Sequence, residues 1–430
     1  MPDNRNAIDA EQGIARILMP ERQQVELREF HLDGAVPADH RVRAVWAFVE
    51  GLDLSTLYRG IISVEGGAGR PATDPRILMA LWLYATVEGV GSARALDRLC
   101  DEHVVYQWIC GGVGVNYHTL SDFRVQNGDV LDELLTQSVA VLMREGIVDL
   151  TRVAQDGMKV RASAGASSFR RKKTLRACKR EAREQVTALK KELNEDPAGS
   201  SRRQEAARER AAKDRLERVK RALDRAEELE KEKATRKGKQ AVRVSTTDPD
   251  ARVMKMGDGG FRPAYNVQFS SDTGSQAVVG VAVNAAGNDQ GELVPMVDQI
   301  EDRYGIVPVE ILVDGGYNGH SNLDALEGRT TVITPVPQPK DATVDPYRPK
   351  ETDSPAVASW RRRMKTASAK RIYKERAATA ECVNAQARNR GLLRFLVRGL
   401  DKVKAVALWY ALAHNMSRMI AYEMLGEAAA

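Results

Sequence analysis

The stretch VDLTRVAQDGMKV, residues 148–160, marks the point where apolar residues stop recurring at helical spacing and begin to recur as in a strand. The predicted strand carries the dipeptide Asp156-Gly157. Two further strands are predicted at 264–270 and 276–283. Because only a short polar turn separates these two, they indicate an antiparallel hairpin.

Further along the chain, short apolar segments at 309–314 and 330–336 predict two more strands. Between the hairpin and these strands, apolar residues recur at helical spacing from Leu293 onward, and Asn288 or Asp289 is expected to cap that helix. Strands separated by helices of this length imply a sheet with parallel members and helices packed on its faces. The expected fold class is therefore α/β (α+β), a mixed sheet with flanking helices.

Residues 1–146 predict an all-α N-terminal domain. Asp74, followed by a proline at the first helical position, and Ser92 are expected helix caps, and Asp129 is expected to cap a later helix. Short helices joined by tight turns suit docking on DNA. They also suit any small helical bundle, so the pattern leaves both interpretations open.

A charged insert at 169–240 divides the predicted sheet domain into 147–168 and 241–430. Apolar residues keep near-heptad spacing in both halves of the insert: Leu175, Cys178, Ala182, Leu189 and Leu193, then Leu216, Val219, Leu223 and Ala226. The intervening Asn-Glu-Asp-Pro-Ala-Gly at 194–199 cannot continue a helix. We expect an inserted helical hairpin, a basic coiled-coil arm, although a disordered linker is the alternative. The stretch 381–422 is expected to be helical, with His414 as a core residue.

Composition is typical of a globular protein, with 43% apolar and 29% charged residues in 430. No apolar stretch reaches the roughly 18 residues that a membrane span needs, and the polar N-terminus shows no export signal. The four cysteines are scattered without a Cys-x-x-Cys pair, which favours a reducing compartment over a disulfide or thiolate-zinc framework. These features predict a cytoplasmic protein with no membrane partner.

Positive charge is concentrated in two places. Residues 170–243 hold 26 Lys and Arg against 14 Asp and Glu, although the whole chain carries only +6. A second run at 361–376 holds eight basic residues and one acid. Such segregation is consistent with a surface that follows phosphates and equally with solvated helix faces.

Three acids are candidates for chemistry: Asp156 and Asp314, each at a predicted strand end before glycine, and Glu381, at the start of a predicted helix. Two divalent cations held by such carboxylates could activate an oxygen nucleophile and relieve charge on a phosphodiester. Taken singly, Asp-Gly is an ordinary turn dipeptide, and an acid at a helix N-terminus often only complements the helix dipole. The order of the three acids along the chain is the informative feature.

Eight segments of the chain match motifs of one known family, in the family's order: DPRILMALWLY (74–84), YHTLSDFR (117–124), VAQDGMKVRA (153–162), RPAYNVQ (262–268), VDGGYNG (313–319), YKERAATAE (373–381), RFLVRGLDKVKA (394–405) and LAHNM (412–416). With these segments the chain resembles a bacterial insertion-sequence DDE transposase. That family has an RNase H-like catalytic core and a helical InsH-type N-terminal domain. The resemblance spans nearly the whole sequence.

The resemblance implies specific site residues. Asp156, Asp314 and Glu381 fall on the family's metal-binding catalytic triad, and Tyr373 and Arg376 fall on its DNA-contacting pair.

The family's usual spacing is Y-x2-R-x3-E-x6-K, whereas here four residues separate Arg376 from Glu381, and Arg388 occupies the lysine position. Arginine remains cationic and can fork onto a phosphate. Glu375 is a rival to Glu381 as the catalytic acid.

The same resemblance implies a transposase that uses two divalent metal ions, Mg²⁺ or Mn²⁺, on double-stranded DNA: the element's terminal inverted repeats and the target. It implies a homodimer or larger assembly on DNA and a cytoplasmic, nucleoid-associated location. One alternative is an RNase H-like nuclease without strand transfer. The other is a transposase-derived DNA-binding protein that no longer cuts.

Overall fold

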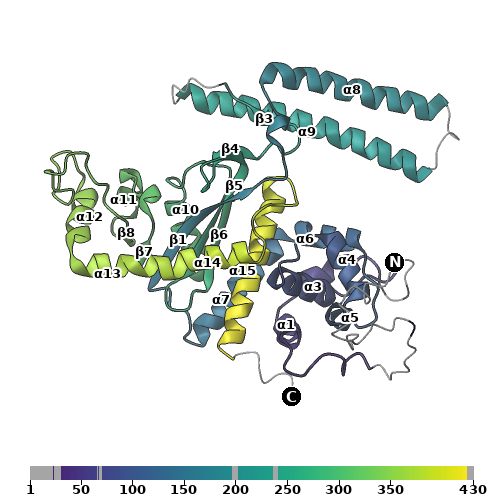
Figure 1. Ribbon diagram of the computed structural model, residues 1–430, viewed down its shortest axis with the longest axis horizontal. Coiled ribbons are helices and arrows are strands. Elements are labelled where there is room, and N and C mark those ends of the chain that lie inside the picture. The colour runs from purple at the N-terminus through teal and green to yellow at the C-terminus, as the bar shows by residue number, and fades with distance from the viewer. Residues whose placement is uncertain are drawn as a thin grey trace, which may run out of the picture.

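The computed structural model describes residues 23, 31–64, 66, 70–195, 202–235 and 241–423. Its centre is a mixed sheet with strand order β4-β5-β1-β7-β8, and β6 pairs with β5 (Figure 1). The strands of this sheet are β1 (Arg152–Arg161), β4 (Arg252–Lys255), β5 (Phe261–Asp272), β6 (Val278–Asn284), β7 (Glu310–Leu312) and β8 (Thr331–Ile333). A separate two-stranded ladder joins β2 (Phe169–Arg170) to β3 (Val244–Ser245).

The pairing within the sheet confirms the predicted mixture of strand directions. β5 and β6 form the predicted antiparallel hairpin, and β5 also pairs antiparallel with β1. On its other side β1 is parallel to β7, which is parallel to β8. Since parallel neighbours need a crossover, the chain inserts helix α10 between β6 and β7, and α11 between β7 and β8.

The helices before the inserted hairpin are α1 (Arg41–Glu50), α2 (Ser55–Arg59), α3 (Pro75–Val87), α4 (Ala93–Glu102), α5 (Val104–Cys110), α6 (Tyr117–Gln126) and α7 (Gly128–Arg144). The predicted caps Asp74 and Ser92 are confirmed, because their side chains accept the backbone N–H of Arg76 and Ala95. The prediction for Asp129 was wrong. α7 begins one residue earlier, so Asp129 lies in its first turn, where an acid still favours the helix dipole.

The helices that follow β6 are α10 (Leu293–Tyr304), α11 (His320–Leu326), α12 (Pro355–Lys365), α13 (Ala367–Arg376), α14 (Cys382–Asn389) and α15 (Leu400–Ala421), with a π-helical turn at Ala377–Glu381 between α13 and α14. The single helix predicted over 381–422 is therefore wrong. Gly391 and Gly399 adopt left-handed backbone angles, with φ of 93° and 91°, that end one helix and precede the next. The predicted cap of α10 at Asn288 or Asp289 is also wrong, since Glu292 holds that position.

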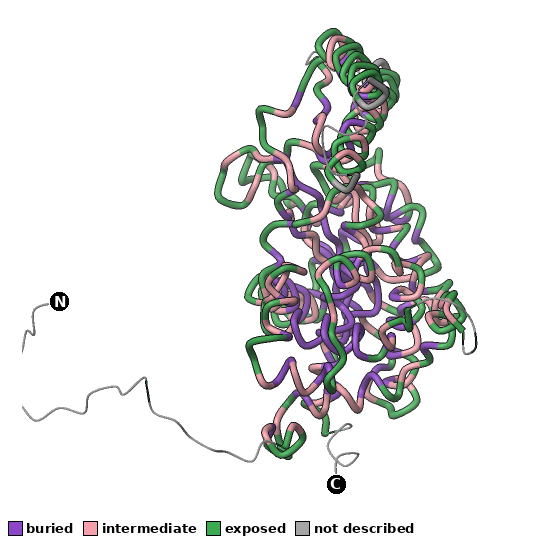
Figure 2. Tube along the Cα trace, turned by 90° about the vertical axis from the view of Figure 1, so that its right-hand side faces the viewer, coloured by how far each residue is buried: buried purple, intermediate pink, exposed green. Residues whose placement is uncertain are grey.

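Helix α15 connects the helical N-terminal part with the sheet. It contacts α3, α6 and α7 on one side and β6 on another, and Figure 1 shows it between the two parts. One continuous cluster of buried apolar residues runs through all of these elements, and in Figure 2 the buried residues gather in the body of the molecule. His414 of α15 is confirmed as a core residue: its Nε2 lies 2.9 Å from the Gln276 carbonyl oxygen, and burial lowers its pKa to about 4.

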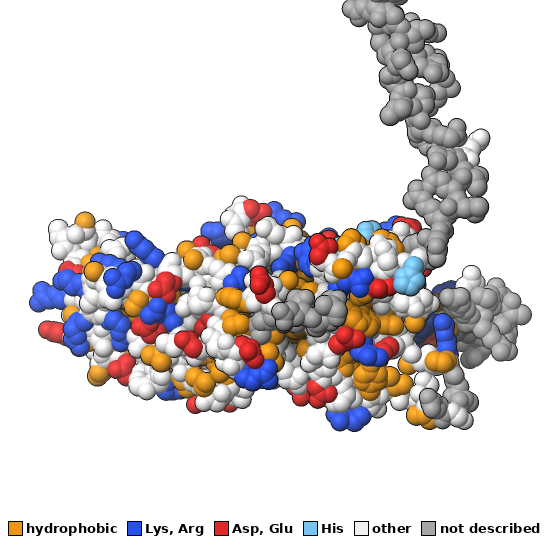
Figure 3. Space-filling view, turned by 90° about the horizontal axis from the view of Figure 1, so that it is seen from below, with side chains coloured by type: hydrophobic (Ala, Val, Ile, Leu, Met, Phe, Trp, Pro, Cys, Tyr) orange, Lys and Arg blue, Asp and Glu red, His pale blue; other side chains and the backbone are white. Residues whose placement is uncertain are grey.

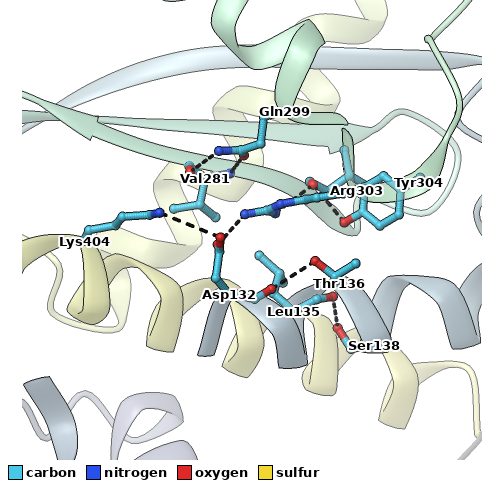
Figure 4. A network of polar contacts seen from close by, with 10 residues as sticks. Asp132, Leu135, Thr136, Ser138, Val281, Gln299, Arg303, Tyr304 and Lys404 are labelled. Carbon is cyan, nitrogen blue, oxygen red and sulfur yellow. Dashed lines mark hydrogen bonds and ion pairs between the residues drawn. The ribbon is translucent and has the colours of Figure 1, made fainter. Parts of the chain in front are cut away.

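A polar junction accompanies this core (Figure 4). The Asp132 carboxylate of α7 pairs with Arg303 of α10 and lies 3.7 Å from the Lys404 ammonium of α15. Arg303 also donates to the Val279 carbonyl of β6, at 3.2 Å. The Asp132 carboxylate and the largely buried Arg303 guanidinium thus link α7, α10, α15 and β6.

The insert between β2 and β3 contains two long helices, α8 (Lys172–Glu195) and α9 (Arg202–Thr235), which contact each other. A small apolar cluster of its own lies at the base of this pair: Leu175, Ala222, Leu223, Ala226, Leu229 and Val244. Figure 2 shows the pair as a mostly exposed projection above the body. Of the break predicted at 194–199, residues 196–199 lie outside the described residues.

Candidate active site

Asp156 lies on β1, and Asp314 follows the end of the neighbouring parallel strand β7. The sequence suggested that Asp156 ends its strand, but the residue lies in the middle of β1. Ala154 of β1 is paired with Leu312 of β7, and each aspartate follows two residues later, so the two are level with each other. Asp314 accepts the Gly316 backbone N–H at 2.7 Å, which fixes its carboxylate beyond the strand end.

Glu381 approaches Asp156 through an arginine. The Arg376 guanidinium lies 2.5 Å from Oε1 of Glu381 and 3.7 Å from Oδ1 of Asp156. Its side chain is only 13% exposed, whereas that of Glu381 is 51% exposed. Arg376 is thus a counter-ion shared by the two acids.

The π-helical turn explains the unusual spacing between these two residues. Residues five apart do not share a face of an α-helix, but the wider π turn repeats at i+5 and brings them together. A π turn typically accommodates one inserted residue in a helix and is frequent at functional sites. The extra residue between Arg376 and Glu381 is absorbed in this way.

The environment of Asp156 is partly buried and charged. Burial raises its pKa to about 6, Arg376 opposes that shift, Asp314 adds to it, and a hydrogen bond from Asn384 opposes it. That bond is 2.9 Å long and runs from Asn384 Nδ2 to Asp156 Oδ2. Asn384 lies one helical turn after Glu381 in α14, and no pattern in the sequence singled it out.

The oxygen donors of this region are of the kind that hard cations prefer. As arranged here, however, the carboxylates do not form a set of ligands around one ion. The available donors are carboxylate oxygens, together with the buried Asn384 Oδ1, which has no hydrogen-bond partner within the described part of the chain. Among the described residues, no three His, Cys, Asp or Glu side chains surround one point closely enough to hold an ion. Arg376 lies where Asp156 and Glu381 come nearest to each other.

The remaining predicted residues are distributed around this centre. Tyr373 precedes Arg376 by nearly one turn of α13, and the guanidinium carbon lies 5.7 Å from its ring centre. Arg388 is exposed in the last turn of α14. Glu375, the rival acid, faces elsewhere: it pairs at 2.7 Å with Arg152, which also binds Glu310.

Asp289, which the sequence suggested only as a helix cap, lies against β1 at Gly157, on the face of the strand opposite to the Asp156 side chain. Instead of capping α10, it accepts hydrogen bonds of 2.6 Å from the side-chain amides of Asn266 and Gln268 on β5. Both amides are fully buried. The available signal was the pair of polar residues at alternate positions of an otherwise apolar strand, which indicates a polar site under that face of the sheet.

Charge on the surface differs from one region to another. Figure 3 views the face opposite the helical hairpin, where Lys and Arg are interspersed with Asp and Glu. On the hairpin, α8 presents Arg176, Arg180 and Arg183 as an exposed row at helical spacing. Part of the excess of Lys and Arg over Asp and Glu in this segment is thus exposed on one side of α8.

Comparison with known families gives two matches. A model described as "Transposase domain (DUF772)" matches residues 30–126, and one described as "Transposase DDE domain" matches residues 345–420. The second match includes Glu381, while Asp156 and Asp314 lie outside both. No curated protein and no solved structure matches the chain.

No helix in the described ranges is long and apolar enough to cross a membrane. The two family matches lie at opposite ends of the chain and both describe transposase domains. Together they support an insertion-sequence DDE transposase.

Proposed function

We propose that the chain binds the terminal inverted repeats of its element, cleaves phosphodiesters at the element ends and joins the resulting 3′-hydroxyl to target DNA. The observation that carries the proposal is the level placement of Asp156 and Asp314 on parallel neighbours, with Glu381 linked to Asp156 through Arg376. Carboxylates from two neighbouring strand segments and a third from a helix could hold a pair of divalent ions that stabilises phosphoryl transfer.

The proposal extends to the fold and its division into domains. The mixed sheet, with β1 between an antiparallel and a parallel neighbour, supports an RNase H-like catalytic domain formed by 147–168 and 241–430. Residues 1–146 would recognise the repeats, as the transposase-domain match over 30–126 supports. The hairpin of 169–240 would be an inserted coiled-coil arm.

In the proposed mechanism Asp156, Asp314 and Glu381 would hold two divalent ions, Mg²⁺ or Mn²⁺. When bound, these ions supply Lewis-acid stabilisation of charge on the scissile phosphate and of the attacking oxygen. The donor chemistry described above, including the unpartnered Asn384 oxygen, fits such ions. Asn384 orients the Asp156 carboxylate through its hydrogen bond.

Cationic side chains would position the DNA. Arg376 pairs with both Asp156 and Glu381, and its planar fork could transfer to a phosphate beside the break. Tyr373 packs next to it, and the exposed Arg388 would hold a further phosphate. The DNA is double-stranded, and two ends must be joined, so a homodimer or larger assembly is proposed on DNA in the cytoplasm, at the nucleoid.

Product analysis tests this function. Full-length protein, Mg²⁺, a donor carrying the element ends and a target plasmid are expected to yield joined donor–target DNA. Cut donor without any joined product would instead favour the nuclease alternative. DNA binding with neither product would favour a protein that has lost catalysis, although all three acids are present.

The contacts of the two rival glutamates predict different effects of substitution. Glu381→Gln is expected to slow cleavage by on the order of a hundredfold or more, because the third carboxylate is lost. Glu375→Gln is expected to leave cleavage within about threefold of the parent, since its partner Arg152 keeps Glu310. Cleavage rates of the two variants, matched for DNA binding, measure the difference. The reverse order would assign the role to Glu375.

A further inference from the structure

One side of helix α8 carries a strip of basic side chains. Five residues, all exposed or half-buried, make up this α8 row: Lys173, Arg176, Lys179, Arg180 and Arg183. At about 100° per residue they fall within roughly a third of the helix circumference. The four from Arg176 onward also line one shallow depression on this helix. The α8 row is therefore a continuous, strongly positive surface.

Packing fixes the direction of the α8 row. Leu175 and Ala182 are buried and lie on a different side of α8, where α9 contacts it. α9 is the helix nearer the body, since its Arg218 lines a cleft together with Asp122 of α6 and Lys402 of α15. Figure 1 accordingly shows α9 between α8 and the body. The α8 row is thus directed away from α9 and is open to a partner.

Ion pairing differs between the two helices of the hairpin. On α9, Lys213, Lys220 and Arg225 each lie within 2.6 Å of a glutamate oxygen of their own helix. In the α8 row, Arg180 lies 3.9 Å from Glu184. The other four members form no ion pair with any residue that the structure describes. The charge of the α8 row is thus left for a partner or for solvent ions.

This arrangement is unfavourable for an isolated helix. Cations three or four positions apart, such as Arg176 and Arg180, repel each other. No acid lies in the first turn of α8, where the helix dipole would favour one. A line of phosphates would relieve both effects, and the α8 row is about 15 Å long, roughly the rise of four base pairs. By contrast, the face opposite the hairpin mixes both signs of charge (Figure 3).

We propose that the α8 row binds the sugar–phosphate backbone of double-stranded DNA, at a surface distinct from the one around Asp156. This inference rests on the proposed function and adds a contact surface to it. Because the row is directed away from α9, the DNA that it holds lies along the hairpin and is not the phosphodiester to be cut. Such contacts position DNA without reading its bases, and their contribution to affinity falls with salt.

The salt dependence of DNA binding tests the proposal. Fluorescence anisotropy of the full chain is measured with two duplexes, one carrying an element end and one of unrelated sequence, without divalent ions so that no cleavage occurs. The row variant Arg176→Gln/Lys179→Gln/Arg183→Gln is expected to bind both duplexes on the order of ten- to a hundredfold more weakly. The slope of log affinity against log salt should fall by about 2 to 3.

A control variant on α9 removes the same charge. Lys213→Gln/Lys220→Gln/Arg225→Gln replaces three cations that glutamates already neutralise. Its affinity is expected to stay within about threefold of the parent, with the slope lowered by less than about 1. An equal loss in the two variants would mean that net charge matters and the α8 row does not.

A charge-keeping variant and the oligomeric state complete the test. Arg176→Lys/Lys179→Arg/Arg183→Lys is expected to keep the parental slope, and a loss as large as that of the glutamine variant would contradict a role for charge. Circular dichroism verifies folding.

The outcomes separate this inference from the proposed function. If the parent binds both duplexes and the row variant matches its affinity and slope, the inference is wrong and the proposed function stands. If the row variant keeps parental DNA binding but changes the oligomeric state in sedimentation, the α8 row is a subunit contact and the inference is equally wrong. If the parent binds neither duplex, the proposed function fails as well.

Discussion

Replacement of Asp156 by asparagine is expected to slow DNA cleavage by about three orders of magnitude or more, which corresponds to roughly 4 kcal/mol of lost transition-state stabilisation. Asp156 is the most central of the three proposed ligands: it is level with Asp314 and lies 3.7 Å from Arg376, the partner of Glu381. Asparagine has the same shape and can still accept the hydrogen bond from Asn384. The loss would therefore reflect the charge and not the fold. Single-turnover cleavage of an end-containing substrate measures it.

The same substitution is expected to stabilise the protein. The folded state raises the pKa of Asp156 from 3.8 to about 6, so between these values the folded state binds more protons than the unfolded state. Stability is therefore lost as pH rises through that window. At pH 7 the ionised carboxylate costs about 2 to 3 kcal/mol, which asparagine would recover in part, since the Arg376 pairing is lost as well. Urea unfolding at pH 5 and 7 would detect the change.

Asp272→Asn is the matched control for both measurements. Asp272 is a buried acid whose pKa is also raised by burial, but it pairs with Val153, three residues before Asp156 on β1, and binds Ser275. Its amide variant is expected to cleave DNA at the parental rate. Cleavage by Asp156→Asn at that rate, with folding intact, would remove Asp156 from the mechanism.

The neighbourhood of Asp156 and Asp314 could be predicted because it depends on local patterns. Each acid belongs to a short apolar strand segment, and an intervening helix is the usual connection between parallel strands. The local pattern could not determine where each strand ends. Asp156 was therefore expected at the end of a strand, whereas it lies in the middle of β1. The catalytic roles of both residues stay predictions.

The surroundings of Glu381 could not be predicted in the same way. Four residues instead of the usual three separate Arg376 from Glu381. In an α-helix this extra residue would turn the two side chains away from each other, so the motif alone did not predict their contact. A π turn restores the contact, but nothing in AATAE distinguishes a π turn from an α turn by composition. Asp289 was missed for a related reason: an acid just before a helix suggests a cap, and only the folded sheet brings Asn266 and Gln268 to it.

The packing of the N-terminal helices was the largest feature beyond the reach of sequence patterns. Periodicity shows that a helix has an apolar face but not which distant element covers it. Trp82 of α3 donates to a backbone carbonyl of α6, and Trp409 of α15 donates to the Arg124 carbonyl of the same helix at 3.0 Å. Residues nearly 300 positions apart thus share one core.

Trp409→Ala is accordingly expected to lower the free energy of unfolding by about 3 to 5 kcal/mol. The side chain is fully buried and lies with its ring centre 6.2 Å from that of Phe123, so truncation leaves a cavity and an unpaired Arg124 carbonyl. Lys402→Ala, an exposed change on the same helix, should cost less than about 0.5 kcal/mol. Urea unfolding followed by circular dichroism measures both.

Because α15 contacts α3, α6, α7 and β6 together, the Trp409 cavity should weaken the helical part and the sheet at once. Amide hydrogen exchange in Trp409→Ala is expected to accelerate by similar factors in α3 and in β6. If protection fell in α3 while β6 kept parental rates, the two parts would unfold independently, and the shared core would not couple them. A joint change would mean that the segment proposed to recognise the element ends and the sheet proposed to cut them form one cooperative unit. A DNA end bound by the first would then be held in a fixed relation to Asp156 and Asp314.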